Sequence, residues 1–316
     1  MKRILVIRGG AIGDFILTLP AIKLLRDHFP DAHIEILGCK HIIALAEKRF
    51  YADAIRSIDD RALAGFFTKT NQLPIELIRY FAGFDLILSY LFDSEAIFRT
   101  NLHFCGIKTL LTGPAKLSRD EHAAYQLARP LKEIGLSLHS PAARIYPTER
   151  DREFARDFLT GLGTPVLAFH PGSGSEAKNW PLENWMRLGE HFLASGWALL
   201  IAGGEADEKR VRCLEIGWQQ RPVRFARNLS LPHLAGLLEN GVFVGHDSGI
   251  SHIAAAVGAR SLLLFGSTDP AVWAPANANA TVLRASEGDL CSLDVGTVIE
   301  KVTESAHELM RIGIST

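Results

Sequence analysis

The stretch RGGAIGDFILTLP, residues 8–20, follows the apolar run KRILVI and decides which fold the chain is expected to adopt. A short apolar strand, a glycine-containing turn and a helical segment, in that order, predict the first strand–loop–helix unit of a parallel sheet. The turn also leads to a carboxylate, Asp14, where the helix is expected to begin. The first question is therefore whether this loop binds a dinucleotide or serves another chemistry.

The loop departs from the dinucleotide-binding fingerprint, which requires G-x-G-x-x-G after the first strand. When Gly10 and Gly13 are aligned with the second and third glycines, Arg8 stands where the first should be. The acidic residue expected after the second strand, HIEILG, is also missing, because Cys39 and Lys40 follow that strand. An NAD(P)-dependent oxidoreductase is therefore the less favoured hypothesis.

Asp14 has two interpretations that its own segment does not separate. An aspartate at a helix start can be the N-cap, which accepts hydrogen bonds from the free N–H groups of the first turn. The same carboxylate, at a helix start that opens onto a cleft, can act as a general base.

The pattern of the opening segment recurs along the whole chain. Short apolar runs alternate with segments of helical composition, which predicts parallel sheets: KRILVI, HIEILG, AIRSID, FDLILSY and KTLLTG, then PVLAFHPG, WALLIAGG, VRFARN, GVFVGHD, RSLLLFG and ATVLRA. Residues 137–150 contain two prolines and no sustained period, as a linker does. We therefore expect an α/β protein with two doubly wound, Rossmann-like domains, residues 1–150 and 151–316.

Composition excludes several classes of function. The chain has 316 residues, with 34 Lys and Arg against 35 Asp and Glu and no basic arm, so nucleic acid is not an expected partner. Its four cysteines form no CxxC pair, which favours a reducing compartment. No apolar run reaches the roughly 18 residues of a membrane helix. A cytoplasmic protein is expected.

Two tandem domains of this class are expected to face each other across a cleft at the carboxyl ends of their sheets, where such folds bind ligands. HPGSGSEAKNWP, residues 170–181, follows a strand and has the chemical content of a phosphate-binding loop, although it is not a Walker A motif. Its candidate ligand-binding residues are Ser173, Gly174, Ser175 and Lys178. A solvated loop with an exposed lysine is the alternative.

A second strand-to-helix turn, GHDSGISHIAAAVGA, begins at residue 245. Asp247 or Ser248 is expected to cap the helix, and Gly249 leaves the helix N-terminus open to a diphosphate. His252 lies four residues beyond Ser248, on the same face. These neighbours on one helical turn cannot align as a hydrolytic triad, whose members converge from different elements.

A third turn, AGGEADE, places Glu205 at a helix start. A carboxylate there can bind the vicinal hydroxyls of a ribose, but it also favours the helix dipole. The segment of residues 61–84 mixes Phe66, Phe67 and Tyr80 with basic residues. It suits an anionic glycolipid or a membrane surface, or else it is an ordinary helix with a buried face.

Together these loops resemble glycosyltransferase family 9, the heptosyltransferases that build the lipopolysaccharide inner core from ADP-heptose. The resemblance is carried by RGGAIGDFILTLPAIKLLRDHFP, by HPGSGSEAKNWPLENW and by VGHDSGISHIAAAVGARSLLLFGSTDP. It implies a GT-B architecture with an amino-terminal acceptor domain and a carboxyl-terminal donor domain, and inverting transfer without metal or other cofactor. The implied partners are ADP-heptose, a glycolipid or glycan acceptor and, by peripheral contact, the inner membrane surface.

The resemblance also implies roles for individual residues. Asp14 matches the general base, Lys178 the donor-phosphate lysine and Glu205 the ribose contact. The donor-binding turn corresponds to Asp247, Ser248, Gly249 and His252, with Ser248 where several members have threonine. No D-x-D pair is present to chelate a metal for the diphosphate. A noncatalytic nucleotide-binding protein remains the main alternative.

Overall fold

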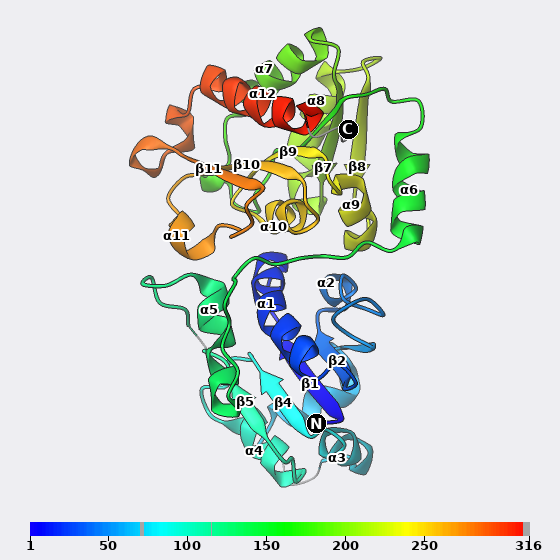
Figure 1. Cartoon of the computed structure of the whole chain (residues 1–316), viewed down its shortest axis with the longest axis vertical. Helices are drawn as coiled ribbons and strands as arrows, with labels where there is room; N and C mark the ends of the chain where they lie inside the picture. The colour runs from blue at the N-terminus through cyan, green and yellow to red at the C-terminus, as the bar shows by residue number, and fades with distance from the viewer. Residues whose placement is uncertain (70–72, 115, 312–316) are drawn as a thin grey trace. The chain divides into compact units, whose positions relative to one another are not determined.

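The computed structural model describes residues 1–69, 73–114 and 116–311 and divides the chain into two compact units, Met1–Pro141 and Ala142–Thr316 (Figure 1). The division falls within residues 137–150, the predicted linker, and nine residues before the predicted boundary at 150/151. The functional roles expected of the two domains stay predictions.

The first unit is built on a parallel sheet whose strands, in its described residues, lie in the order β3-β2-β1-β4-β5. The strands are β1 (Arg3–Arg8), β2 (His33–Gly38), β3 (Ala54–Ser57), β4 (Leu86–Ser89) and β5 (Leu110–Thr112). The helices are α1 (Ile12–His28), α2 (Lys40–Ile43), α3 (Ile75–Ala82), α4 (Ile97–Phe104) and α5 (Ala123–Ala128), with 3₁₀ turns η1 (Arg61–Phe67) and η2 (Arg129–Ile134).

The second unit repeats this arrangement with the strand order β11-β10-β9-β6-β7-β8 in its described residues. The strands are β6 (Val166–His170), β7 (Ala198–Gly203), β8 (Val223–Arg227), β9 (Val242–His246), β10 (Arg260–Phe265) and β11 (Ala280–Arg284). The α-helices are α6 (Glu149–Leu159), α7 (Leu182–Ala194), α8 (Glu208–Gly217), α9 (Leu231–Leu238), α10 (Gly249–Ala256), α11 (Pro270–Trp273) and α12 (Val295–Arg311). The 3₁₀ turns are η3 (Glu176–Lys178), η4 (Glu205–Asp207), η5 (Ser286–Gly288) and η6 (Leu290–Ser292).

Both strand orders reverse beside the first strand of the unit, between β1 and β4 and between β6 and β9. Such a reversal is the topological switch point of a Rossmann-like sheet, and ligands bind at the carboxyl ends of the strands there. The predicted fold class, α/β with two Rossmann-like sheets, is therefore confirmed.

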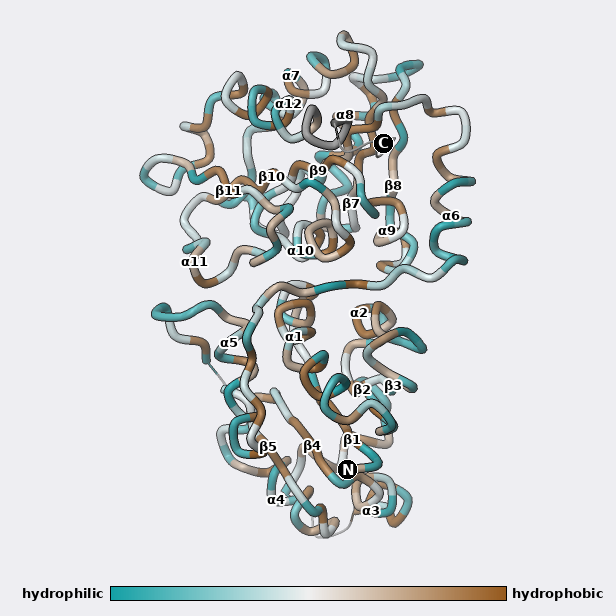
Figure 2. Tube along the Cα trace, viewed as in Figure 1, coloured by the Kyte–Doolittle hydropathy of each residue, from teal (hydrophilic) through white to brown (hydrophobic). Residues whose placement is uncertain are grey.

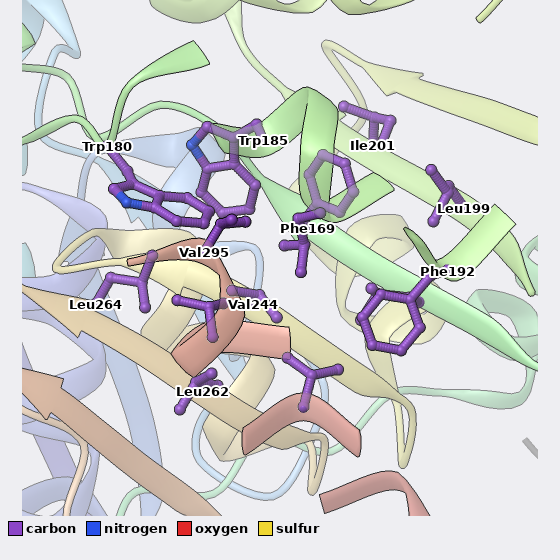
Figure 3. Packing of buried hydrophobic residues seen from close by; sticks show 14 of the residues in the cluster. Phe169, Trp180, Trp185, Phe192, Leu199, Ile201, Val244, Leu262, Leu264 and Val295 are labelled. Atoms are coloured by element: carbon purple, nitrogen blue, oxygen red, sulfur yellow. The ribbon is translucent and has the colours of Figure 1, made fainter. Parts of the chain in front are cut away.

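The core of the second unit follows from the alternation of its strands. On one face, alternate residues of four neighbouring strands point toward α7, α8 and α12: Leu167, Phe169, Leu199, Ile201, Val242, Val244, Leu262 and Leu264. Figure 3 shows Trp180, Trp185 and Phe192 packed with these strand residues.

The hydropathy of single elements in both units agrees with the burial of their side chains. Figure 2 shows hydrophobic segments along β4 and α1, which are largely buried, and a largely hydrophilic α6, which is largely not.

No helix within the described ranges is both long enough and apolar enough to cross a membrane.

His246, at the end of β9, is a polar group inside this core. Its side chain is buried, and its Nε2 accepts the Trp180 backbone N–H at 2.8 Å. Its Nδ1 lies 3.2 Å from the Gly172 carbonyl and donates to it, since Nε2 is already an acceptor. Burial lowers the pKa of His246 to about 3, so the imidazole is neutral and can make both bonds. The loop between β6 and α7 is thereby fixed to β9 near both of its ends.

The pKa of His246 makes stability depend on pH. The unfolded chain takes up a proton at this histidine near pH 6.5 and the folded protein does not, so stability falls as the pH drops from 6.5 to about 3. We expect His246→Gln to cost about 1–3 kcal/mol in urea unfolding at about pH 7.5, because a buried group loses a hydrogen bond. The cost should shrink at about pH 5, where the wild type has lost more stability than the variant. A cost that is equal at both pH values would contradict this role of His246.

Candidate functional site

The loop of residues 171–181 and the N-terminus of α10 follow β6 and β9, the two strands that flank the switch point of the second sheet. They lie side by side: Lys178 Nζ is 3.1 Å from Asp247 Oδ2, and Ser248 Oγ is 3.5 Å from His170 Nδ1. The third turn that the sequence identified, residues 202–208, joins them, because Asp207 Oδ2 lies 2.9 Å from His170 Nε2. The structure therefore brings all three turns together, at the edge of the sheet where such folds bind ligands.

Arg210, from α8, binds both ends of the 171–181 loop. Its guanidinium donates to the carbonyls of Pro171, at 3.0 Å, and Trp180, at 2.6 Å, and pairs with Glu176 at 2.6 Å. Only 14% of the Arg210 side chain is exposed. The two ends of the loop are thus tied to one rigid cation as well as to His246. No local pattern predicts this role, since Arg210 is one of several charged residues on its helix.

The candidate residues of the loop lie on its open side. Ser173 Oγ is 2.9 Å from the Ser175 carbonyl and 2.8 Å from Asn179 Oδ1. Gly174 has a φ of +74°, and a Cβ built there meets no atom within 4 Å, so conformation rather than space favours glycine. The Lys178 side chain is 39% exposed, which leaves its ammonium accessible to a ligand while it pairs with Asp247.

Ser248 is the N-cap of α10, as one of the two sequence hypotheses predicted, and its Oγ accepts the Ser251 N–H at 3.5 Å. The Ser248 side chain is linked to two others, those of His170 and Asp207. His170 approaches Ser248 through Nδ1 and contacts Asp207 Oδ2 through Nε2, at 2.9 Å. Asp207 also accepts the Gly204 N–H at 3.1 Å. The three side chains come from three different elements. They differ in this from Asp247, Ser248 and His252, which lie on one helical turn and were excluded as a triad from the sequence.

Two of these three side chains, His170 and Asp207, are buried, and their contacts set the charge state of the Asp207 carboxylate. Burial raises the pKa of Asp207, but the hydrogen bond and charge of His170 and the Gly204 N–H outweigh burial and lower it below its usual value. A Cβ on Gly172 would collide with Asp207, so this position requires glycine. The sequence analysis missed His170 and Asp207. The available signal was a histidine that ends an apolar strand.

The other candidate ligand-binding residues of the second unit belong to the same turns as Ser248 and Asp207. Gly249 is the first residue of α10, and Asp247 precedes the N-cap with 14% of its side chain exposed. His252 is buried, with 5% exposure, so it is not a solvated histidine. Glu205 opens η4 and is exposed, which leaves its carboxylate accessible to a ligand.

In the first unit, Asp14 is the third residue of α1, whose N-cap is Ala11. The N-cap hypothesis is therefore wrong in position, because the helix begins before Asp14. The carboxylate still stabilises the helix start, since Oδ2 accepts the Ala11 N–H at 3.0 Å. About a third of the Asp14 side chain, 36%, is exposed and accessible to a reactant.

Arg8 occupies the place of the glycine missing from the dinucleotide fingerprint. Its guanidinium donates to the Asp14 carbonyl at 3.3 and 3.2 Å and lies 3.4 Å from Asp14 Oδ1. It also lies over the Tyr90 ring, 5.5 Å from the ring centroid. Burial lowers the pKa of Arg8, and the charge of Asp14 opposes that shift. Arg8 thus orients the segment that carries the carboxylate.

Where the structure describes it, the segment of residues 61–84 mostly packs its apolar side chains into the core of the first unit. Phe66 is fully buried, and the Tyr80 hydroxyl donates to Glu35. Phe67 is 44% exposed and stacks on Phe98. Residues 70–72 lie outside the described residues. Contact of this segment with an acceptor or a membrane stays a prediction.

Among the residues that the structure describes, no three His, Cys, Asp or Glu side chains are grouped so that they could hold a metal ion.

Comparisons with known proteins agree with the fold. The family model described as glycosyltransferase family 9 (heptosyltransferase) matches residues 117–303. Lipooligosaccharide heptosyltransferase 2 of Haemophilus influenzae is 32% identical over 324 residues, covering 93% of this chain and 91% of that protein. Lipopolysaccharide heptosyltransferase 1 of Pseudomonas aeruginosa is 34% identical over 300 residues, covering 85% and 79%.

A solved structure, the ADP-heptose lipopolysaccharide heptosyltransferase II of Escherichia coli, matches with a TM-score of 0.79 at 18% identity and covers 98% of this chain and 99% of that one. This likeness shows the shared GT-B fold. The family model spans more than half of the chain, and both sequence relatives exceed 30% identity over most of it. The chain therefore belongs to glycosyltransferase family 9, the heptosyltransferase family, and is a glycosyltransferase.

Proposed function

We propose that the chain transfers heptose from ADP-heptose to a lipopolysaccharide-core acceptor, with inversion at the anomeric carbon and without a metal ion. The names of the relatives support the substrates, since they are lipooligosaccharide and lipopolysaccharide heptosyltransferases and the solved protein is named for ADP-heptose. The observation that carries the proposal is the pairing of Lys178 with the N-terminal turn of α10 at the switch point of the second sheet.

The second unit supplies what a departing nucleoside diphosphate needs. Lys178 brings a positive charge, and the backbone N–H groups of the serine–glycine loop and of the α10 N-terminus favour an anion. Asp207 and His170 hold the Ser248 hydroxyl in one direction, so it meets the diphosphate already oriented. In this proposal Glu205 binds the ribose hydroxyls, and Asp247, Gly249 and His252 complete the donor turn.

The first unit supplies the base. The acceptor hydroxyl oxygen forms the new bond to the anomeric carbon as the bond from that carbon to the diphosphate oxygen breaks. The hydroxyl proton passes to the Asp14 carboxylate, and the electron pair leaves with the diphosphate. Attack opposite the leaving group inverts the anomeric carbon. The unit Met1–Pro141 binds the acceptor, and the unit Ala142–Thr316 binds the donor.

Family membership favours glycosyl transfer over an NAD(P)-dependent oxidoreductase, and turnover separates it from noncatalytic nucleotide binding. The proposed acceptor also places the enzyme in the cytoplasm, with peripheral contact at the inner membrane surface. The experiment that tests the function is transfer of heptose from ADP-heptose to lipopolysaccharide from cells that lack this chain, followed by mass spectrometry. Release of ADP without a heptosylated product would contradict the proposal.

Lys178 is expected to bind the donor diphosphate directly. Lys178→Ala should weaken ADP binding by about 1.5–3 kcal/mol, the usual contribution of a hydrogen bond to a charged group. Isothermal titration calorimetry with ADP measures the change. Lys301→Ala is the matched control, because Lys301 is also ion-paired and is exposed to a similar degree, 41% against 39%. Unchanged ADP affinity in Lys178→Ala would contradict this role and favour the alternative, a solvated loop with an exposed lysine.

Metal independence follows from the lysine and the helix N-terminus that take the place of a chelated cation. Initial rates of transfer should stay within about twofold of the untreated enzyme in excess EDTA, because these groups already offset the diphosphate charge. Complete loss of activity that magnesium or manganese restores would mean that the diphosphate is held in another way.

Asp14→Asn separates the catalytic role of Asp14 from its structural one. Asparagine can still accept the Ala11 N–H, so the melting temperature and the affinity for ADP should change little. Because the amide cannot take up the acceptor proton, kcat at saturating donor should fall by about 10²–10⁴.

Asp27→Asn, at the other end of α1, is the control for loss of a charge from this helix. A kcat for Asp14→Asn within a few-fold of the wild type, with the melting temperature unchanged, would show that Asp14 only stabilises the helix start.

A further inference from the structure

The first unit contains a cavity of about 220 Å³ that the proposed chemistry leaves unused. It lies at the carboxyl ends of β4 and β5, and its lining includes Leu91, Phe92, Phe98, Arg99, Thr112 and Gly113. All of these residues belong to one unit and lie within the described ranges. The cavity therefore exists within the first unit alone.

The floor and wall of the cavity are built from packed aromatic side chains. Phe98 is buried, and Phe67 stacks on it with ring centroids 5.2 Å apart. The Tyr90 ring fills the space that a Cβ on Gly113 would need, and its hydroxyl donates to the Leu127 carbonyl at 2.7 Å. The exposed Phe67 of the 61–84 segment thus supports the cavity from outside. These contacts give the cavity a fixed shape.

The rim offers both an aromatic surface and a cation. Phe92 is 76% exposed, the most exposed large hydrophobic side chain in the described residues. Both carboxylate oxygens of Asp93 are used by backbone N–H groups, those of Phe98 at 3.2 Å and Arg99 at 2.8 Å. Arg99 is exposed and makes no ion pair with another residue that the structure describes. Its guanidinium is therefore available to a ligand.

The cavity adjoins the loop that leads to Asp14. Strand β1 pairs with β4, with Ile7 opposite Ser89, so the loops after these strands are neighbours at the carboxyl edge. A Cβ built on Gly9 would lie 3.5 Å from Leu91 Cδ2, and one on Gly10 would lie 2.8 Å from Asp14 Oδ2. Two glycines therefore separate the cavity lining from the carboxylate.

We propose that this cavity binds a sugar unit of the acceptor saccharide, next to the unit whose hydroxyl is attacked, with Phe92 and Arg99 as the residues that recognise it. The inference rests on the proposed function, because it uses Asp14 as the group that meets the attacking hydroxyl. A sugar ring presents an apolar C–H face and a rim of hydroxyls. The exposed Phe92 ring packs against the face, while Arg99 and the Thr112 hydroxyl bind the oxygens.

The chemistry of the lining favours a saccharide over a lipid surface. A membrane-binding face is convex, broad and apolar, with several cations beside it. This site is concave, and hydroxyls and one guanidinium line it together with the apolar residues. A concave site with an apolar floor and a few polar groups is typical of small-molecule recognition.

The test uses Phe92→Ala and Arg99→Gln in the full chain. The probe is the O-deacylated lipopolysaccharide saccharide from a strain that lacks this chain, which is free of long acyl chains. We expect each substitution to raise the KM for this saccharide and its Kd in calorimetry by about 3- to 10-fold, with the KM for ADP-heptose within about twofold. Phe104→Ala and Arg79→Gln are the controls, because both residues are exposed in the same unit but do not line the cavity.

Two results would overturn the inference and leave the proposed function intact. One is normal transfer with an unchanged KM and Kd for the saccharide in both variants. The other is an unchanged affinity for the saccharide while binding to anionic lipid vesicles is lost in Phe92→Ala, which would make the site a membrane contact. Binding of the saccharide that depends on Phe92 and Arg99, without any transfer by the wild type, would instead support the cavity and overturn the proposed function.

Discussion

His246 holds the loop of residues 171–181 through one accepted and one donated hydrogen bond, and both need a neutral imidazole. Burial supplies that neutrality by lowering the pKa of the histidine. Arg210 also holds the same loop, through the carbonyls of Pro171 and Trp180. A loop fixed in this way keeps its donors in position without a ligand, so little conformational freedom is lost when an anion binds. Lys178 and the serine–glycine turn depend on this support.

The two units divide the chemistry that the proposed transfer requires. The second unit holds cationic and dipolar groups, which stabilise the negative charge that develops on the leaving diphosphate. The first unit holds a carboxylate beside a buried arginine, and a fixed cavity two glycines away. Each of these charged groups has a partner of opposite charge beside it, since Arg8 lies 3.4 Å from Asp14 Oδ1 and Asp247 Oδ2 lies 3.1 Å from Lys178 Nζ.

Local patterns in the sequence predicted both sheets and the turns that carry the candidate residues. Each strand is a short apolar run, and each turn carries glycine, serine or aspartate, so neighbouring residues contain the signal. Arg210, His170 and Asp207 escaped prediction because they act through contacts between residues distant in sequence, such as the pair 37 positions apart that joins His170 to Asp207. One of the two interpretations of Asp14 made it the N-cap, yet α1 begins earlier, at Ile12 after Ala11. Helix boundaries are less well determined by local sequence than the helices themselves.

The central claim is that the loop of residues 171–181 and the first turn of α10 bind the donor diphosphate. Hydrogen–deuterium exchange of the full chain with and without ADP tests it most directly, because backbone N–H groups that bind phosphate exchange more slowly. The account predicts slower exchange in peptides that cover residues 171–179 and 247–252, with little change at β11 on the edge of the same sheet. Slower exchange confined to the residues 9–14 loop of the first unit, or no change with ADP bound, would contradict it.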